Sequence, residues 1–421
     1  MSQTKAAGQT SVIDRGTEKL YYADAYLQEF DAVVQQCVPL GTGEDASPRY
    51  AVTLDRTAFF PEEGGQSPDR GTLCAVPEGG ACSSAEEAAR QAAPRAEVRD
   101  VQIREGIITH VTDRPFAPGT RVHGVLDFHH RFSNMQQHSA EHLFSGLVYA
   151  RLGLSNVGFH LSDTEVTMDY SGPVTAEEAH ELELEVNRLI WKNLESRQEF
   201  PTAEELKTIS YRSKIEIDGQ VRLVIFPDCD ICACCAPHVA RTGEIGVFRI
   251  LSVQSHRGGV RIHMLAGERA FRYLAQEDDI LTGAARSLSA PPELVPERIE
   301  KLRLDLCDTK HLLSGARLDL LMKEAGEIPA SQKNVCLFTE EMEEPTLREV
   351  INRLMAVHEG VCGIFNGNDT DGYRYVIGST TDVLSMQKRL KETLQARGGG
   401  KPPMIQGQIH AGRAAIEALF Q

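Results

Sequence analysis

The residues best suited to chemistry in this sequence are two pairs of metal-ligating side chains. His138 and His142 lie four residues apart. On a helix this spacing puts both imidazoles on one face, about one turn apart, where they can share an ion. Cys234 and His238 repeat the spacing and add a thiolate and another imidazole. The four side chains form a nitrogen and sulfur set suited to Zn²⁺, so the sequence predicts a zinc hydrolase.

Two other interpretations compete for these residues. A purely structural zinc site could use the four cysteines that crowd into one short segment, which are Cys229, Cys232, Cys234 and Cys235. Closed structural sites usually draw their thiolates from two separated pairs, which disfavours this interpretation. The segment from His138 to His142 also fits the H-x-x-E-H pattern of a metalloprotease, with Glu141 as the general base. Such a protease would not need the downstream Cys-x-x-x-His, so the mixed ligand set is preferred.

Bulk composition places the chain among globular proteins of several domains. Its 421 residues, 41% of them hydrophobic, exceed what one core comfortably accommodates. The segment 1–14 is polar, and no run approaches the ~18 apolar residues of a membrane span. Six of the ten cysteines are scattered singly, which favours reduced thiols over a disulfide framework. We therefore expect a cytoplasmic protein without a membrane segment.

The charge distribution limits how the chain could meet nucleic acid. A formal charge of −16 argues against extensive phosphate neutralisation. Near the C-terminus a basic run makes the local net charge positive, and this run is a candidate RNA contact. A solvated helix end explains it equally well. Its members are Lys388, Arg389, Lys391, Arg397 and Lys401, with Arg413 further on.

Changes of pattern divide the chain into segments of different structure. Short alternating runs such as 49–54 and 106–111, separated by Gly and Pro, predict a small β-barrel up to about residue 128. The Ala- and Glu-rich stretch 77–94 is typical of a surface insertion. Ser133 or Asn134 is expected to cap a helix that runs through residue 152.

The remaining segments predict helices packed on sheets. Thr175 and Glu178 form a capping box for a second amphipathic helix. Strand-like runs are expected at 222–226, 246–253 and 260–265. Leucines at helical intervals in the charged segment 291–324 predict an exposed hairpin or connector, and strands alternating with helices from about residue 332 predict a separate α/β domain.

Three motifs, taken together, resemble the editing domain of alanyl-tRNA synthetase and the free-standing AlaX-type editing proteins. The first is the barrel segment 54–66, which contains Gly64 and Gly65 and is followed by Asp69 and Gly71. The other two are the H-x-x-x-H helix at 134–143 and the C-x-x-x-H loop at 230–246. Residues 259–267 are similar to the closing strand of that domain, and 397–407 to the glycine-rich end of a DHH-associated C-terminal domain.

This resemblance implies a long-form editing protein of α+β class with several domains. Its expected parts are an N-terminal β-barrel at 1–128, an α+β zinc-binding editing domain at 129–275, a helical connector at 276–328 and a DHH-associated α/β domain at 329–421. Two positions depart from the family pattern. The usual triple glycine is Glu63-Gly64-Gly65, and the usual Gly-Gly-Thr before the last histidine is Cys235-Ala-Pro237.

The function implied by the resemblance is hydrolysis of a wrong aminoacyl ester on alanine tRNA. Serine is the main expected amino acid, with glycine as a second, and Zn²⁺ is the implied cofactor. Thr57 and Gln66 are the candidates for contacting the amino acid or the attacking water, and Gly64 and Gly65 for shaping its pocket. Family analogy adds a homodimer through the C-terminal half as a candidate assembly. A non-catalytic tRNA-binding module stays open as a further alternative, since the altered motifs could mark a retired site.

Overall fold

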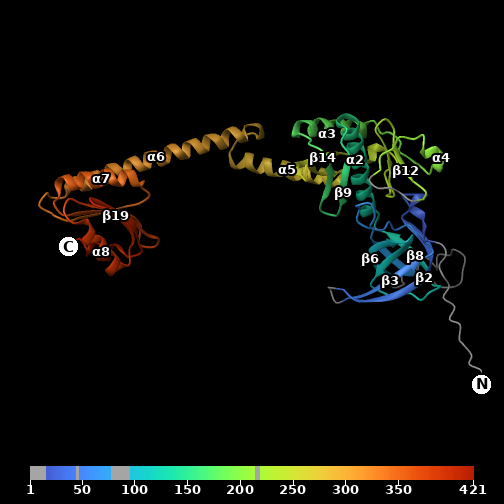
Figure 1. Cartoon of the computed structure of the whole chain (residues 1–421), viewed down its shortest axis with the longest axis horizontal. Coiled ribbons are helices and arrows are strands. Elements are labelled where there is room, and N and C mark those ends of the chain that lie inside the picture. The colour runs from blue at the N-terminus through green and yellow to red at the C-terminus, as the bar shows by residue number, and fades with distance from the viewer. Residues whose placement is uncertain (1–15, 44–46, 77–94, 214–218) are drawn as a thin grey trace, which may run out of the picture. The chain divides into compact units, whose positions relative to one another are not determined.

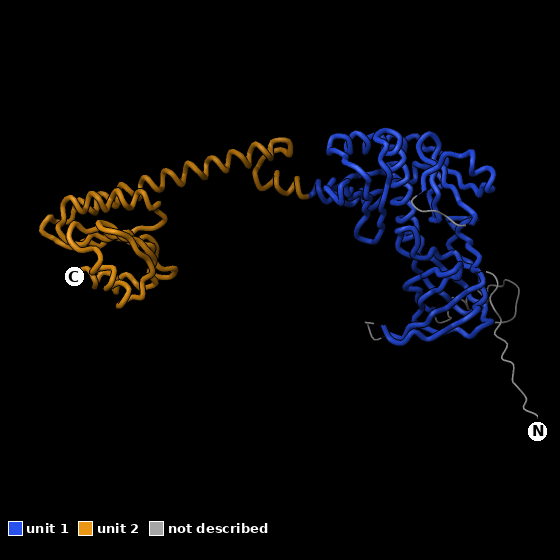
Figure 2. Tube along the Cα trace, in the orientation of Figure 1, with its two compact units in different colours: residues 1–279 blue, residues 280–421 orange. Residues whose placement is uncertain are grey.

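The structure, a computed structural model, describes residues 16–43, 47–76, 95–213 and 219–421. The polar N-terminal segment and the predicted insertion at 77–94 lie outside these ranges. The chain divides into two compact units, residues 1–279 and 280–421 (Figures 1 and 2). Within the described ranges, no helix has both the length and the apolar character that crossing a bilayer requires.

A closed six-stranded barrel forms the first part of unit 1, as the alternating runs predict. Around the barrel the strands follow the order β2-β3-β7-β6-β5-β8. Alternate residues of β7 are buried because successive side chains of a strand point to opposite faces. The strands are β2 (Glu29–Thr42), β3 (Pro48–Leu54), β5 (Gly71–Ala75), β6 (Arg95–Arg104), β7 (Ile107–Thr112) and β8 (Arg121–Leu126). Before the barrel, β1 (Glu18–Lys19) leads into the short helix η1 (Leu20–Tyr22) and pairs with β4 (Arg56–Thr57).

The helix α2 (Phe128–Leu152) starts earlier than the sequence predicted. Asp127, not Ser133 or Asn134, is its N-cap, and its carboxylate accepts a hydrogen bond from the backbone N–H of His130. The predicted start was wrong because Ser133 and Asn134 are buried inside the helix, where tertiary packing outweighs their preference for caps. Gly153 ends the helix in the left-handed conformation.

Two sheets and a second helix surround α2 in unit 1. The predicted capping box of α3 (Ala176–Trp191) is present, with Thr175 and Glu178 bonding each other's backbone. A four-stranded sheet has the order β14-β15-β10-β9, and a three-stranded sheet the order β11-β12-β13. Their strands are β9 (Asn156–Leu161), β10 (Val166–Tyr170), β11 (Arg197–Glu199), β12 (Leu223–Phe226), β13 (Asp230–Ala233), β14 (Phe248–His256) and β15 (Gly259–Ala266). The remaining helices are α4 (Ala203–Leu206), η2 (Thr242–Ile245) and α5 (Gly267–Ser287).

A buried ion pair connects the barrel with the start of α2. Asp69, in the loop before β5, and Arg131, in the first turns of α2, are both fully buried. The Arg131 Nε atom lies 3.0 and 2.9 Å from the two carboxylate oxygens of Asp69. Arg131 also donates to the carbonyls of Ala25 and Ala58, at 3.0 and 2.5 Å, and Asp69 accepts from the Phe60 N–H at 2.6 Å. The guanidinium of Arg131 and the carboxylate of Asp69 are therefore hydrogen-bonded to each other and to the backbone, as buried charges require.

Unit 2 contains a five-stranded sheet in the order β16-β17-β18-β20-β19 with helices on both faces. Leu347 and Val350 of α7 share a core with Val376, whereas Leu390 of α8 packs with Tyr375, so the two helices cover opposite faces. The strands are β16 (Val335–Thr339), β17 (Val361–Asn368), β18 (Gly372–Ser379), β19 (Arg397–Lys401) and β20 (Met404–Ile409). The helices are η3 (Pro292–Leu294), α6 (Val295–Glu327), α7 (Glu344–Val357), α8 (Val383–Leu394) and α9 (Arg413–Glu417).

Candidate metal centre

The structure brings together the four residues that the sequence pairs single out. His138 and His142 lie on one face of α2, and Cys234 and His238 lie in the loop that follows β13. One ligand atom from each lies within 4.8 Å of the other three. The Cys234 sulfur lies 3.3 Å from His238 Nε2 and 3.7 Å from His138 Nε2. Ligands around a tetrahedral zinc ion are separated by about 3.3–3.8 Å, so these two distances match a zinc site, and the donor types suit Zn²⁺.

Partner groups orient all three imidazoles. The Nδ1 atom of His138 donates to Gln66 Oε1 at 2.8 Å, and that of His142 donates to Asp230 Oδ2 at 2.9 Å. His238 Nδ1 lies 3.0 Å from the hydroxyl of Ser139. Such partners fix the ring and its tautomer, which leaves each Nε2 atom for the shared ion. The three histidines are almost fully buried, so their positions are set by packing as well.

The electrostatics of the cluster favour a thiolate at Cys234. Burial opposes ionisation, but the charges of His138 and His238 hold the pKa of Cys234 well below its usual range. Burial also opposes the charge of His142, yet hydrogen bonds to Asp230 and Cys234 raise the pKa of His142 to about 9. For His238 burial prevails and lowers the pKa to about 3. Metal coordination requires the thiolate and three neutral imidazoles, so an ion that binds here would displace the proton of His142.

Replacing Asp230 by asparagine is expected to weaken zinc binding roughly 10–100-fold, as is typical for the partner of a ligating histidine. The variant removes the carboxylate that accepts from His142 and leaves Arg212, which bonds Asp230 at 2.7 and 2.8 Å, without its counter-charge. Competition with a chromophoric chelator measures the change. Asp228→Asn is the matched control, because Asp228 is exposed two residues away. Equal affinities for the two variants would show that Asp230 has no role in the centre.

The structure gives the rival ligands other surroundings. Cys229 and Cys232 donate to the carbonyls of Leu143 and Ala233. Burial raises the pKa of Cys229 to about 12. Among the described residues, no metal-sized group contains all four neighbouring cysteines, although His142, Asp230 and Cys232 form a second group. The nine cysteines in the described ranges are free thiols.

Glu141, the general base of the protease interpretation, is held by hydrogen bonds in the core. Its Oε1 atom accepts from Ser145 Oγ at 2.7 Å and from Asn156 Nδ2 at 2.6 Å. The carboxylate lies 3.9 Å from His142 Nε2 and is 1% exposed. A buried carboxylate with two donors is oriented as part of the support for α2, which disfavours a role as a mobile base.

Thr57 is buried and bonded to a histidine that the sequence did not indicate. Its hydroxyl lies 2.8 Å from His110 Nε2 and accepts from the Phe59 N–H at 3.1 Å. His110 Nδ1 lies 3.1 Å from the Val52 carbonyl, which makes Nδ1 the donor and Nε2 the acceptor. Among the described residues, no hydrogen bond joins Thr57 to the four candidate ligands.

His110 is expected to make stability depend on pH. Burial lowers its pKa to about 4, whereas in the unfolded chain it titrates near ~6.5. Between those values the unfolded state binds a proton that the native state does not, so the free energy of unfolding falls as the pH is lowered, by on the order of 1–3 kcal/mol. Urea unfolding at several pH values should show a flatter dependence for His110→Gln. Parallel curves for the two proteins would contradict this assignment.

The turn around Gly64 and Gly65 places Gln66 beside His138. Both glycines have positive φ, +64° and +85°. A Cβ on Gly65 would lie 2.2 Å from the Phe159 carbonyl oxygen, so only glycine allows the turn to approach β9 this closely. The Gly65 carbonyl accepts from the Leu161 N–H at 2.7 Å. Gln66 is fully buried, and its Nε2 donor has no partner among the described residues.

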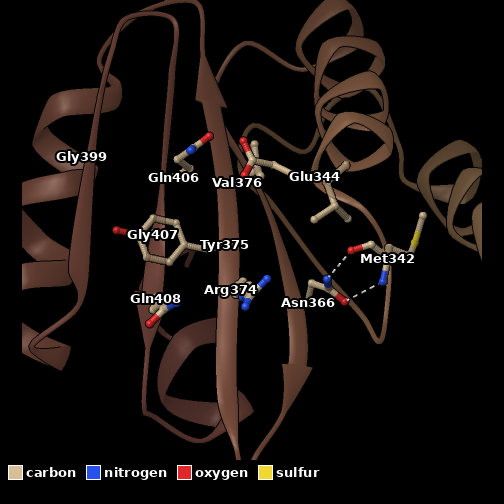
Figure 3. A pocket seen from close by; sticks show the side chains of 11 residues that line it. Met342, Glu344, Asn366, Arg374, Tyr375, Val376, Gly399, Gln406, Gly407 and Gln408 are labelled. Carbon is tan, nitrogen blue, oxygen red and sulfur yellow. Dashed lines mark hydrogen bonds between the residues drawn. The ribbon is translucent and has the colours of Figure 1, made fainter. Parts of the chain in front are cut away.

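The basic C-terminal run is divided between two elements of unit 2. Lys388, Arg389 and Lys391 are exposed on α8, whereas Arg397 and Lys401 lie at the two ends of β19. The other face of the same sheet carries a cavity of about 470 Å³ (Figure 3). Its polar lining is mostly uncharged and comes from α7 and strands β17, β18 and β20, with Glu344, Asn366, Arg374, Gln406 and Gln408.

Comparison with known proteins places this site in a family context. Residues 221–263, which include Cys234 and His238, match the threonyl and alanyl tRNA synthetase second additional domain. The alanine–tRNA ligase of Methanothrix thermoacetophila is 29% identical over 430 residues, covering 96% of this chain and 44% of the relative. That of Halobacterium salinarum is 31% identical over 381 residues, covering 87% and 38%. The chain is therefore an alanyl-tRNA synthetase-related protein. It spans less than half the length of these curated relatives.

This relationship confirms the family prediction made from the three motifs. The domain match at 221–263 contains Cys234 and His238 but not the two histidines of α2. The alignments with the ligases cover most of this chain. Sequence reasoning missed Ser139, His110 and Phe159, whose ring lies 4.6 Å from that of His138. Ser139 could have been found from its place between the two histidines. His110 and Phe159 carry no local signal, because only the fold brings His110 to Thr57 and Phe159 to His138.

Proposed function

We propose that this protein is a trans-editing hydrolase that removes serine, and to a lesser degree glycine, from mischarged alanine tRNA at a zinc centre. The observation that carries the proposal is the convergence of His138, His142, Cys234 and His238 within 4.8 Å. The relationship to alanine–tRNA ligases supports the choice of substrate, and the matched synthetase domain supports the choice of an editing role.

The chain's own residues provide the positioning that such a reaction needs. Aminoacyl esters are already activated, so holding the acyl group and a water molecule in place is the main task. A bound Zn²⁺ would act as a Lewis acid or as an anchor for the substrate. The Gln66 oxygen accepts from His138, and its buried Nε2, which has no partner among the described residues, can donate to the acyl carbonyl or the water. Thr57, already bonded to His110, contributes a fixed hydroxyl to the same barrel motif.

Deacylation of charged tRNA tests the proposal directly. Zinc-loaded protein is incubated with alanine tRNA carrying serine, glycine or alanine, and the remaining ester is followed over time. We expect release of serine well above the spontaneous rate, slower release of glycine and retention of alanine. Stability of all three esters in the presence of fully metallated protein would overturn the proposal and favour the non-catalytic tRNA-binding alternative.

A metalloprotease is a weaker candidate for the same ligands. A thiolate ligand reduces the Lewis acidity of the ion, and Glu141 is bonded by Ser145 and Asn156. Cys234→Ala would leave a true H-x-x-E-H protease largely metallated. The same variant would cost the editing centre one of its four ligands.

We also propose that the basic residues of the C-terminal domain contact tRNA. Replacing Lys388, Arg389 and Lys391 by glutamine should weaken binding of alanine tRNA severalfold and flatten its salt dependence, because fewer counterions are released. A filter-binding titration at several salt concentrations measures both. Unchanged binding would leave this helix without an RNA role. Zinc as the metal, a cytoplasmic location and a homodimer through the C-terminal half stay predictions.

A further inference from the structure

The two departures from the family motifs meet in space beside the metal centre. Glu63 replaces the first glycine of the barrel motif, and Cys235 replaces the residue after the cysteine ligand. A Cβ on Gly64 would lie 3.4 Å from the Cys235 sulfur. Burial and the charges of Cys234 and Glu63 raise the pKa of Cys235. The turn that contains Glu63 therefore lies against Cys235, although the two residues are 172 positions apart in the sequence.

Glu63 presents a carboxylate oxygen that lacks a hydrogen bond. Its Oε2 atom is buried and has no hydrogen-bond partner among the described residues. It forms a long ion pair with Lys19, whose Nζ lies 3.9 Å away, too far for a hydrogen bond. Lys19 in turn donates to the Tyr22 hydroxyl at 3.4 Å. A carboxylate oxygen in this state can accept a further, charged donor at a modest cost in desolvation.

Glu63 Oε2 belongs to the same turn as Gln66 Nε2, which also lacks a hydrogen bond among the described residues. Glu63 and Gln66 form an isolated antiparallel bridge, and the Gln66 N–H donates to the Glu63 carbonyl at 3.1 Å. Gln66 is 0% exposed, its Nε2 has no partner, and its Oε1 accepts from His138. One short turn therefore carries an anionic acceptor at Glu63 and a neutral donor at Gln66, whose side chain contacts the candidate ligand His138. That combination is complementary to an ammonium group and a nearby carbonyl oxygen.

We propose that Glu63 binds the free α-ammonium group of the aminoacyl ester, with Lys19 holding the carboxylate in place. The inference deepens the proposed function and depends on the same site. It restricts the substrate class to esters of unblocked amino acids. Esters whose amino group is acylated, such as the peptidyl esters of tRNA, would lack the positive charge that Glu63 is proposed to bind.

A binding measurement with hydrolysis-resistant analogues tests this independently of catalysis. The probes are 3′-deoxy-3′-(serylamino)adenosine, an amide in place of the ester, and its N-acetyl derivative. Calorimetric titration of the zinc-loaded protein should show binding of the free-amine probe and at least tenfold weaker binding of the acetylated one. Glu63→Gln should lose on the order of tenfold in affinity for the free-amine probe and little for the acetylated probe.

The matched control is Glu62→Gln, which removes the same charge one residue away. Glu62 is exposed and accepts from Gln102 Nε2 at 2.8 Å. We expect its affinities to equal those of the unmodified protein. Equal loss for both probes in Glu63→Gln, equal loss in both variants, or no binding of the free-amine probe would overturn the inference. If the protein distinguishes the probes through Glu63 but hydrolyses no charged tRNA, the inference stands and the proposed hydrolase function fails.

Discussion

Replacing Cys234 by alanine is expected to remove the bound zinc and to slow deacylation of serine-charged alanine tRNA by at least about a hundredfold. The variant deletes the anionic member of the cluster, and three neutral histidines bind zinc more weakly than the mixed set. Metal content per chain and the deacylation rate of the same preparation measure the two effects. The fold is expected to persist, because α2 and the sheets of unit 1 have their own core.

Cys229→Ala is the matched control for this prediction. Cys229 lies five residues before Cys234 and bonds the Leu143 carbonyl instead of the cluster. Its variant should retain the metal and most of the activity. Loss of zinc from both variants would support the structural four-cysteine site, and retention of zinc by Cys234→Ala would support the protease interpretation.

The second large effect is expected on stability. Arg131→Ala should lower the free energy of unfolding of unit 1 by roughly 3–5 kcal/mol, because it leaves the carboxylate of Asp69 buried without a counter-charge. The same change frees the Ala25 and Ala58 carbonyls, which Arg131 bonds at 3.0 and 2.5 Å. Urea unfolding monitored by circular dichroism measures the change.

The exposed ion pair of Arg70, the residue after Asp69, provides the comparison for Arg131. Arg70 bonds Asp163 at 2.5 Å with both side chains about half exposed. Arg70→Ala should therefore cost less than about 1 kcal/mol. Similar losses for the two variants would mean that the buried pair is no more important than a surface contact. A double variant, Asp69→Asn with Arg131→Met, should recover part of the loss because it removes both charges.

The sequence predicted best those features that are encoded locally. The capping box at Thr175 and Glu178 and the strand runs near 49–54 and 260–265 have the predicted form. Their signals are hydrogen-bonding side chains and alternating hydrophobicity within a few residues. The prediction that His138 and His142 share a metal ion came from the same kind of signal, because i and i+4 spacing on a helix is a local property.

Features that depend on distant contacts were not predictable. Asp69 looked like a motif residue, and nothing near it indicated that Arg131 would be its partner. Ser133 is a preferred cap residue that becomes a core residue because α2 extends one and a half turns before it. The meeting of Glu63 and Cys235 likewise depends on the docking of the barrel turn against the loop after β13. Only the tertiary structure supplies these pairings.

Stepwise zinc addition to metal-free protein, with release of serine from alanine tRNA followed at each step, tests the central claim most directly. We expect the rate to rise in proportion to zinc and to level off at about one ion per chain, the capacity of a single four-ligand site. The metal-free protein should be inactive, and zinc addition should not restore serine release in the His142→Ala variant. Full activity in metal-free protein, or saturation unrelated to one ion per chain, would contradict a catalytic role for the His138, His142, Cys234 and His238 centre.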